Sequence, residues 1–192
     1  MKHGQATQRP SMKRISLEFA DQIKAMRDDR RGVAAIEFGL FAIFLSLCLV
    51  NVADVSIYIY QRMQAENATQ VAAQAAWKTC DVSQLPATTN CAGLATAVRT
   101  ALASTSLGTS VSLKSGSPSE GYYCVSSSNA LQYVSDVSSK PADCTAAGMP
   151  GLQPGDYIQV QTTFPYAPIF PGLSVASTFA TPINSTAIVR LG

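Results

Sequence analysis

One apolar segment constrains the fold of this chain more than any other part of its sequence. From Phe38 to Val50 only Ser46 and Cys48 are even mildly polar, and apolar residues on both sides extend the run past the ~20 residues that a membrane-spanning helix needs. Residues 1–32 hold eight Lys and Arg against four acids, whereas the rest of the 192-residue chain holds six against eight. The positive-inside rule therefore predicts a cytoplasmic N-terminus and an exported C-terminal region.

Three polar side chains, Glu37, Asn51 and Asp54, interrupt this apolar run. Ionisable groups at membrane depth are costly, so each calls for a partner or a function. A plain anchor helix would place Asn51 and Asp54 in the headgroup layer at its outer end, where both are ordinary. Anchoring alone gives no reason for Glu37, which lies near the start of the run.

Three common export signals fit the segment poorly. A secretory signal peptide needs a short basic leader and small residues at its cleavage site, but this leader is long and the best site, residues 51–53, starts with an asparagine. A lipoprotein site would want a small residue before Cys48, where Leu47 stands. The pair Arg30-Arg31 lacks the neighbours of a twin-arginine signal.

A fourth signal fits at every position. The leader ends in Arg30-Arg31-Gly32 and continues as VAAIEF into the unbroken apolar helix, and this string resembles the cleavage region of type IV prepilins and pseudopilins. Within that superfamily, RRGVAAIEFGLF is most similar to the TadE-like family of the tight-adherence (Flp) pilus assembly system. The resemblance covers residues 30 to 78, and no comparably specific motif occurs elsewhere in the chain.

The resemblance gives the residues of this motif their roles. It implies that a prepilin peptidase cuts after Gly32, so that Val33 is the first mature residue, Glu37 the fifth and Phe38 the sixth. Glycine suits a scissile bond because it neither favours helix nor blocks approach. The new α-amine of Val33 would be a costly charge near the apolar phase. Glu37 lies at i+4 on the same helical face and can neutralise it; the resemblance implies that in a filament it meets a neighbouring subunit's amine instead.

The helix is expected to continue beyond the membrane. Residues 56–77 contain no Gly or Pro and many good helix formers, and one helix over 33–78 would be about 70 Å long. A row of small residues, which permits close packing, consists of Ala65, Ala68, Ala72, Ala75 and Ala76. Ahead of the span, Ile15, Phe19, Ile23 and Met26 recur at helical spacing and predict an amphipathic helix in the leader.

Residues 80–192 change character and become rich in Ser, Thr, Gly and Pro. Residues 91–106 predict a second helix with Leu94, Val98 and Leu102 on one face. Strands are expected at 110–114, 121–126, 131–134, 157–164 and 176–191. The fold class is therefore α+β, a long N-terminal helix whose distal half packs on a small antiparallel sheet. The predicted divisions are a leader (1–32), a membrane part (33–55), its continuation (56–79) and the exported domain (80–192).

Cysteine usage agrees with export, because four of the five cysteines follow the span. An even number in an extracytoplasmic domain favours disulfides. Four cysteines allow three pairings that sequence does not choose between, and we favour the short-range set, Cys80 with Cys91 and Cys124 with Cys144. A metal site is disfavoured because no histidine follows the span and no C-x-x-C pair occurs.

Catalysis is disfavoured on similar grounds. The one histidine, His3, lies in the leader, so no Ser-His or Cys-His pair can form in the exported domain. Four acids there, which lie beside turn residues and are expected to be solvated, are Glu120, Asp136, Asp143 and Asp156. No cofactor, nucleic acid or small-molecule substrate is indicated.

The sequence and the resemblance together predict a structural subunit, a TadE-like minor pilin or pseudopilin. Its partners would be a prepilin peptidase, other pilins or pseudopilins and the pilus assembly platform. It would cross the bacterial inner membrane once, with the C-terminal domain periplasmic or extracellular. The alternatives are an uncleaved, membrane-anchored binding protein or adhesin and, more distantly, a secreted enzyme.

Overall fold

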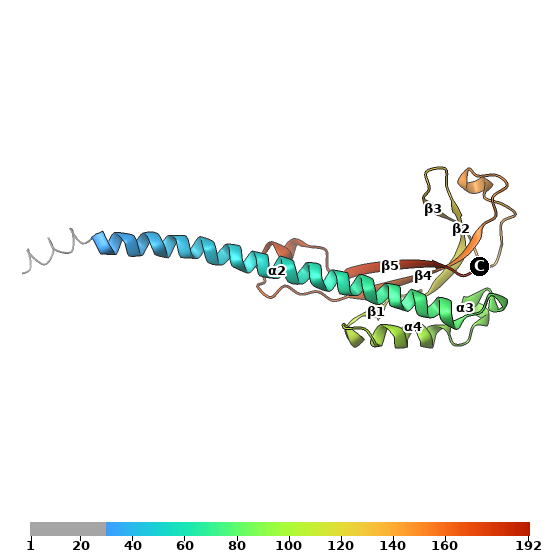
Figure 1. The fold of residues 1–192 in the computed structure, drawn as a ribbon, viewed down its shortest axis with the longest axis horizontal. Helices are drawn as coiled ribbons and strands as arrows, with labels where there is room; N and C mark the ends of the chain where they lie inside the picture. Colours follow the sequence, from blue (N-terminus) through green and yellow to red (C-terminus); the bar gives the residue numbers. More distant parts are fainter. Residues whose placement is uncertain (1–29) are drawn as a thin grey trace, which may run out of the picture. The chain divides into compact units, whose positions relative to one another are not determined.

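The structure, a computed structural model, describes residues 30–192 (Figure 1). The helix predicted around residues 15–26 of the leader lies outside the described residues. The chain divides into two units between Leu49 and Val50. Helix α2 (Arg30–Thr79) runs through both units without interruption.

In the first unit, α2 is an apolar helix whose side chains are almost all exposed. Every side chain from residue 32 to residue 49 is exposed except that of Ala42, which is half-buried. The helix is long and apolar enough to cross a membrane. It holds several large side chains in solvent-exposed positions, among them Phe38, Phe41 and Phe44. In water this surface would be strongly unfavourable.

In the second unit, α2 buries a row of small residues. The side chains of Ala65, Ala68, Ala72, Ala73 and Ala76 are at most 3% exposed. Ala65, Ala68, Ala72 and Ala76 are three or four residues apart and so share one helical face, and Ala73 lies beside Ala72 at the edge of that face. Small side chains allow the helix backbone to approach the sheet closely. The predicted row is thus present, with Ala73 in addition and Ala75 only half-buried.

Five antiparallel strands form one sheet: β1 (Ser112–Leu113), β2 (Ser119–Val125), β3 (Leu131–Asp136), β4 (Gly155–Phe164) and β5 (Ile183–Arg190). Strand β4 is central, since it pairs with β1, β2 and β5, and β3 extends the sheet through β2. Alternate β4 residues are buried, among them Ile158, Val160 and Phe164. This period of two matches the alternation in the sequence and fixes which face meets the helices.

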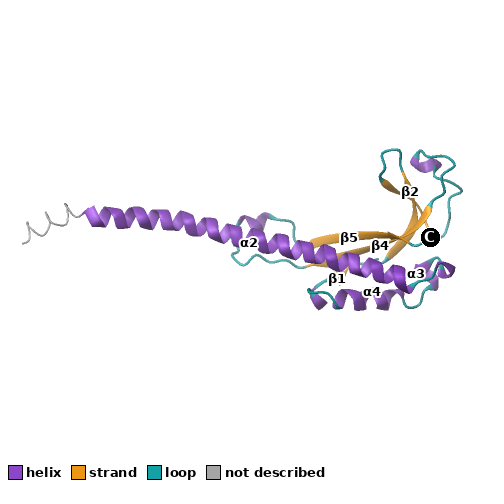
Figure 2. Cartoon of the chain, in the orientation of Figure 1, coloured by secondary structure: helices purple, strands orange, loops and turns teal. Residues whose placement is uncertain are grey.

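Two helices cover the buried face of the sheet (Figure 2). One is the distal part of α2, and the other is α4 (Leu94–Ala103), which buries Leu94, Val98 and Leu102 as predicted. The short helix α3 (Ala87–Asn90) precedes α4. Four 3-10 turns lie in the connections: η1 (Val82–Gln84), η2 (Gly108–Ser110), η3 (Thr145–Ala147) and η4 (Val175–Thr178). The α+β fold class predicted from the sequence is confirmed.

Most element boundaries differ from the predictions by one to three residues, and the start of the last strand differs by seven. The last strand is Ile183–Arg190 and not residues 176–191, because η4 and a loop ending at Pro182 occupy 175–182. Proline has no N–H for a sheet ladder, and the Ser174 hydroxyl accepts the Ala176 N–H at 3.1 Å and starts the 3-10 turn. The second helix begins at Leu94 rather than residue 91, since Cys91 caps α3.

Candidate functional site

The first candidate site is the start of α2, where the sequence places the predicted cleavage motif. Gly32, Val33, Glu37 and Phe38 all lie on the helix and are exposed, and Phe38 is 73% exposed. The backbone of Arg30 and Arg31 forms the first residues of α2. Within residues 32–192, the Glu37 carboxylate makes no hydrogen bond or ion pair. The site therefore presents an acid on an apolar helix without a partner in the same chain.

Gly32 has no steric role in the fold. A Cβ built at Gly32 meets no atom within 4 Å, and the same is true of Gly39. Glycine inside a helix costs about 1 kcal/mol relative to alanine. The backbone of Gly32 is helical, so a protease that cuts after it would have to open this part of the helix.

The second candidate site is a polar junction between α2 and the loop that joins β4 to β5 (residues 165–182), here called the β4–β5 loop. The Asp54 carboxylate is fully buried and accepts the N–H of Ile169 at 3.0 Å and of Phe170 at 3.2 Å. The Asn51 side-chain oxygen accepts the Val175 N–H at 2.9 Å. Two N–H donors are what a buried carboxylate needs to remain paired. Asp54 is thus not the solvated headgroup-layer acid that the sequence suggested.

Aromatic packing strengthens this junction. The ring of Tyr58 meets Tyr166 edge-on at 4.9 Å between centroids and Phe179 at 4.7 Å. Such edge and tilted contacts contribute beyond their buried area. Burial, followed by the nearby charge of Asp54, raises the pKa of the Tyr166 hydroxyl. The hydroxyl therefore stays protonated and donates to the Asp54 carbonyl oxygen at 3.5 Å.

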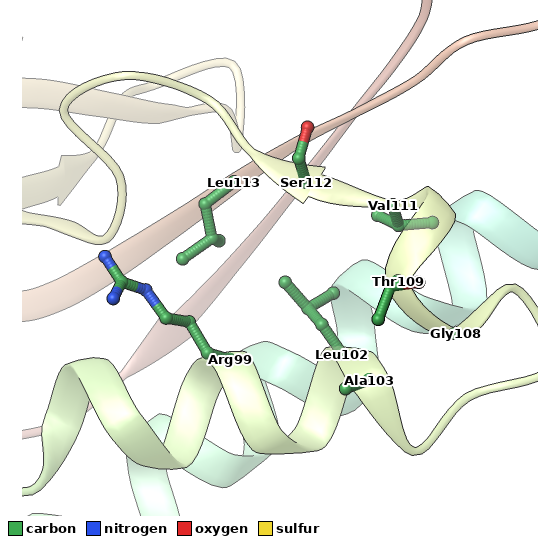
Figure 3. Close-up of a pocket in the computed structure, with 8 residues that line it drawn as sticks. All are labelled: Arg99, Leu102, Ala103, Gly108, Thr109, Val111, Ser112 and Leu113. Carbon is green, nitrogen blue, oxygen red and sulfur yellow. The ribbon is translucent and has the colours of Figure 1, made fainter.

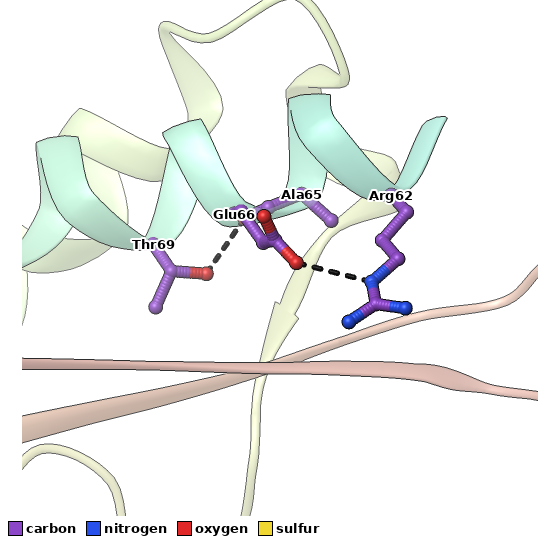
Figure 4. A network of polar contacts seen from close by, with 4 residues as sticks. All are labelled: Arg62, Ala65, Glu66 and Thr69. Atoms are coloured by element: carbon purple, nitrogen blue, oxygen red, sulfur yellow. Dashed lines mark hydrogen bonds and ion pairs between the residues drawn. The ribbon is translucent and has the colours of Figure 1, made fainter. Parts of the chain in front are cut away.

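Further along α2, polar contacts occur within the helix (Figure 4), and one contact joins the helix to the sheet. The Thr69 hydroxyl lies 2.7 Å from the Ala65 carbonyl oxygen and 2.6 Å from the Thr162 hydroxyl of β4. Both threonines are 1% exposed. The outer side of the same turn holds the ion pair of Arg62 with Glu66 at 3.1 Å.

Two acids of the domain are not solvated as the sequence suggested. The Glu120 carboxylate accepts the N–H of Ala87 at 2.8 Å and both the N–H and the hydroxyl of Thr88 at 2.7 Å. Asp156, on the neighbouring strand, is 6% exposed, and its Oδ1 has no hydrogen-bond partner. Burial and then the charge of Glu120 raise the pKa of Asp156 to about 6, whereas Lys140 opposes the shift.

The other two acids behave as the sequence suggested, as exposed turn residues. Asp136 accepts hydrogen bonds from the N–H and hydroxyl of Ser138. Asp143 accepts the hydroxyl of Thr145 at 2.6 Å and the N–H of Gly151 at 3.1 Å. In each case these side-chain and backbone donors lower the pKa of the carboxyl, because they favour its charged form. Neither acid is poised for proton transfer.

One hollow in the domain has few side chains that could carry out chemistry. It has a volume of about 330 Å³ and lies between α4 and β1 (Figure 3). Its lining is mostly small or apolar, and Arg99 supplies its one charged group. Over residues 30–192, no group of three or more His, Cys, Asp or Glu is arranged to hold a metal ion.

The cysteines lie in two disulfide-bonded pairs. Cys80 and Cys91 are joined with a Cα–Cα distance of 5.8 Å, and Cys124 and Cys144 with 5.7 Å. This is the short-range pairing favoured above. The first bond ties the end of α2 to α3, and the second lies in a small core of its own with Ala147. Cys48 is free and exposed.

Together these observations define the architecture of the chain. One N-terminal helix, long and apolar enough to anchor the chain in a membrane, continues into an α+β domain and forms part of its core, which is consistent with a single-pass pilin-like protein. Residues 32–74 match the family model of TadE-like protein, so the resemblance to that family is confirmed over this segment. No curated protein and no solved structure gives a match.

The matched segment joins the two candidate sites. It begins at the proposed scissile glycine and ends within the buried alanine row. It also contains Asn51 and Asp54, whose loop partners lie more than a hundred residues further along the chain. No local pattern in the sequence marks those pairs, although an acid inside an apolar run was a usable signal.

Proposed function

We propose that this chain is a TadE-like minor pilin or pseudopilin, cleaved by a prepilin peptidase after Gly32 and needed to build an adhesive pilus of the Tad type. The family is associated with that pilus, and an anchoring helix that continues into the core of a small domain would suit a structural subunit. Its partners would be the peptidase, other pilins or pseudopilins and the assembly platform. The protein would cross the inner membrane once, with its domain on the outer side.

The observation that carries the proposal is the state of the motif on α2. Gly32 contacts nothing that would exclude a side chain, so the fold gives no reason for a residue that weakens the helix. Glu37 lacks a partner within residues 32–192 and lies among exposed apolar side chains. Both features acquire a reason if the chain is cut after Gly32, because the cut creates the amine that Glu37 can pair with.

The first step of assembly would then be electrostatic. After cleavage, the α-amine of Val33 and the Glu37 carboxylate would lie one helical turn apart, and the pair could form within one chain or between two. In the low dielectric of the bilayer an unpaired charge is costly, so pairing between subunits would favour a defined axial register. The remaining exposed side chains, led by Phe38, would contact lipid or neighbouring helices.

Substitution of the glycine tests the proposal. Gly32→Ala is expected to abolish processing, so that the full-length form accumulates in the membrane and piliation is lost. Gly39→Ala is the matched control, since it lies on the same helix and its Cβ is equally free of contacts. It should be processed normally. Equal gel mobility of the wild-type and Gly32→Ala proteins isolated from membranes would contradict the proposal and favour an uncleaved anchored protein.

A further inference from the structure

The β4–β5 loop is unusual in composition. The chain has no Asp, Glu, Lys, Arg or His from Tyr157 to Val189, a stretch that contains the whole loop. The loop itself reads PYAPIFPGLSVASTFATP. Surface loops of soluble domains ordinarily carry charge, so a long uncharged loop indicates a neighbour other than bulk water.

One side of the loop is packed and the other is bare. Tyr166 and Ala176 are buried in the domain core. In contrast, Ile169, Leu173 and Val175 are 57%, 62% and 55% exposed. Exposed apolar side chains gathered in one segment mark an interaction site more often than scattered ones do.

The bare side chains are held in place by α2. Asp54 binds the N–H groups of Ile169 and Phe170, and Asn51 binds that of Val175. Further N–H groups are satisfied inside the loop: those of Leu173 and Ser174 by the Phe170 carbonyl at 3.2 Å each. Because these donors are paired and the loop prolines have none, much of this backbone can leave water at little cost.

The positions of Asn51 and Asp54 along α2 indicate that the neighbour of the β4–β5 loop is a membrane surface. A membrane span of about 20 residues counted from Val33 ends near Val52. Asn51 and Asp54 lie within a turn of that point on the same continuous helix, and Val52 is itself 64% exposed. A loop fixed to these residues therefore lies at the level where headgroups meet acyl chains, the layer that favours aromatic and apolar side chains without charge.

We propose that the β4–β5 loop is a membrane-interface surface, in which Ile169, Phe170, Leu173 and Val175 enter the headgroup–acyl boundary of a phospholipid bilayer and Asp54 holds them there. A protein neighbour is the alternative occupant, but the loop offers it no charged group for pairing. The proposal rests on the membrane placement of α2 that the proposed function requires. It does not require cleavage at Gly32.

Tryptophan fluorescence can test this directly, because the chain has one tryptophan, Trp77. The full chain is reconstituted in nanodiscs of phosphatidylethanolamine and phosphatidylglycerol with or without brominated acyl chains, which quench nearby indole. The reporter is Leu173→Trp in a Trp77→Phe background, with Val175→Trp as a second reporter. The matched control is Leu131→Trp in the same background, an exposed position on β3.

The proposal predicts that Leu173→Trp and Val175→Trp emit at shorter wavelength and lose most of their emission in brominated lipid. Leu131→Trp should lose little. Trp77 in the unchanged chain should also be unquenched, since it lies 25 residues beyond Val52, about 38 Å along the helix. Asp54→Asn should weaken the quenching of Leu173→Trp, because the amide has one acceptor oxygen and one of the two loop N–H groups then loses its acceptor.

Two results would overturn the proposal. Quenching of the loop reporters no greater than that of Leu131→Trp would show a loop in water. A blue-shifted reporter that brominated lipid does not quench would show a loop covered by protein. A Gly32→Ala chain should give the same quenching as the parent, so failure of the processing hypothesis and failure of this proposal are distinguishable.

Discussion

Helix α2 differs between its two regions in the size and exposure of its side chains. Between residues 32 and 49 the large apolar side chains point outward without cover, whereas between 50 and 79 the buried positions are mostly alanine. Large exposed side chains maximise contact with lipid, and small buried ones let the helix lie close to a sheet. The comparison shows how one uninterrupted helix can serve a membrane in one region and a protein core in the other.

Packing gives the largest expected difference between the regions. Ala68 is fully buried, so Ala68→Leu must displace core atoms and should destabilise the domain by about 3 kcal/mol. Ala35 is exposed in the apolar region, and Ala35→Leu should change the unfolding free energy by less than about 0.5 kcal/mol. Chemical denaturation in detergent measures both. Equal effects would mean that the two regions do not differ in packing.

Substitution of one hydroxyl group in each region is a second test of the difference between the two regions. Thr69→Val removes the contact with the buried Thr162 hydroxyl and should cost about 1–2 kcal/mol in unfolding free energy. Ser46→Ala is its counterpart in the apolar region, where the hydroxyl donates only to the Ala42 carbonyl of its own helix at 2.7 Å. That change should leave the unfolding transition of the domain in place. A shift of the same size in both variants would contradict the division.

The unfolding free energy of the domain should depend on pH through Asp156. Its pKa is raised to about 6 from 3.8, so the folded state binds this proton more tightly than the unfolded state. The resulting stability is fully present below pH 3.8 and is lost as pH rises through 6. Asp156→Asn should therefore be more stable than wild type at pH 7 by about 1 kcal/mol, after allowance for screening by solvent.

The comparison of wild type and Asp156→Asn between pH 4 and 7 is the measurement. The difference in unfolding free energy between the two proteins isolates Asp156. The pH dependence of either protein alone does not, because the lowered pKa values of Asp136 and Asp143 act in the opposite direction. If the difference in unfolding free energy between the two proteins stays the same from pH 4 to pH 7, Asp156 does not cause the predicted pH dependence.

The smallest effect is expected at the surface of α2. Glu66→Gln breaks the exposed ion pair with Arg62 and should lower the unfolding free energy by about 0.3 kcal/mol, an effect that salt removes.

Glu37→Gln should not alter unfolding of the domain but should impair piliation of a processed chain. A fully piliated Glu37→Gln strain would remove the proposed role of that carboxylate.

Much of this architecture could be predicted because its signals are local. The apolar run, the alanine row and the faces of α4 and β4 follow from periods of 3.6 and 2. The roles of Asp54 and Asp156 could not be predicted, because their environments come from distant segments: the Ile169 N–H that Asp54 accepts lies 115 residues away. The predicted start of β5 was wrong, since an apolar, β-prone run also occurs in the loop before Pro182.

The most direct test of the account is the N-terminus of the mature, membrane-associated protein. Edman or mass-spectrometric sequencing of the protein isolated from membranes is expected to begin at Val33. A protein that begins at Met1 would be an uncleaved anchor, and one that begins near Asp54 would be a signal-peptidase product. Either result would contradict the pilin-like processing on which the role of Glu37 depends.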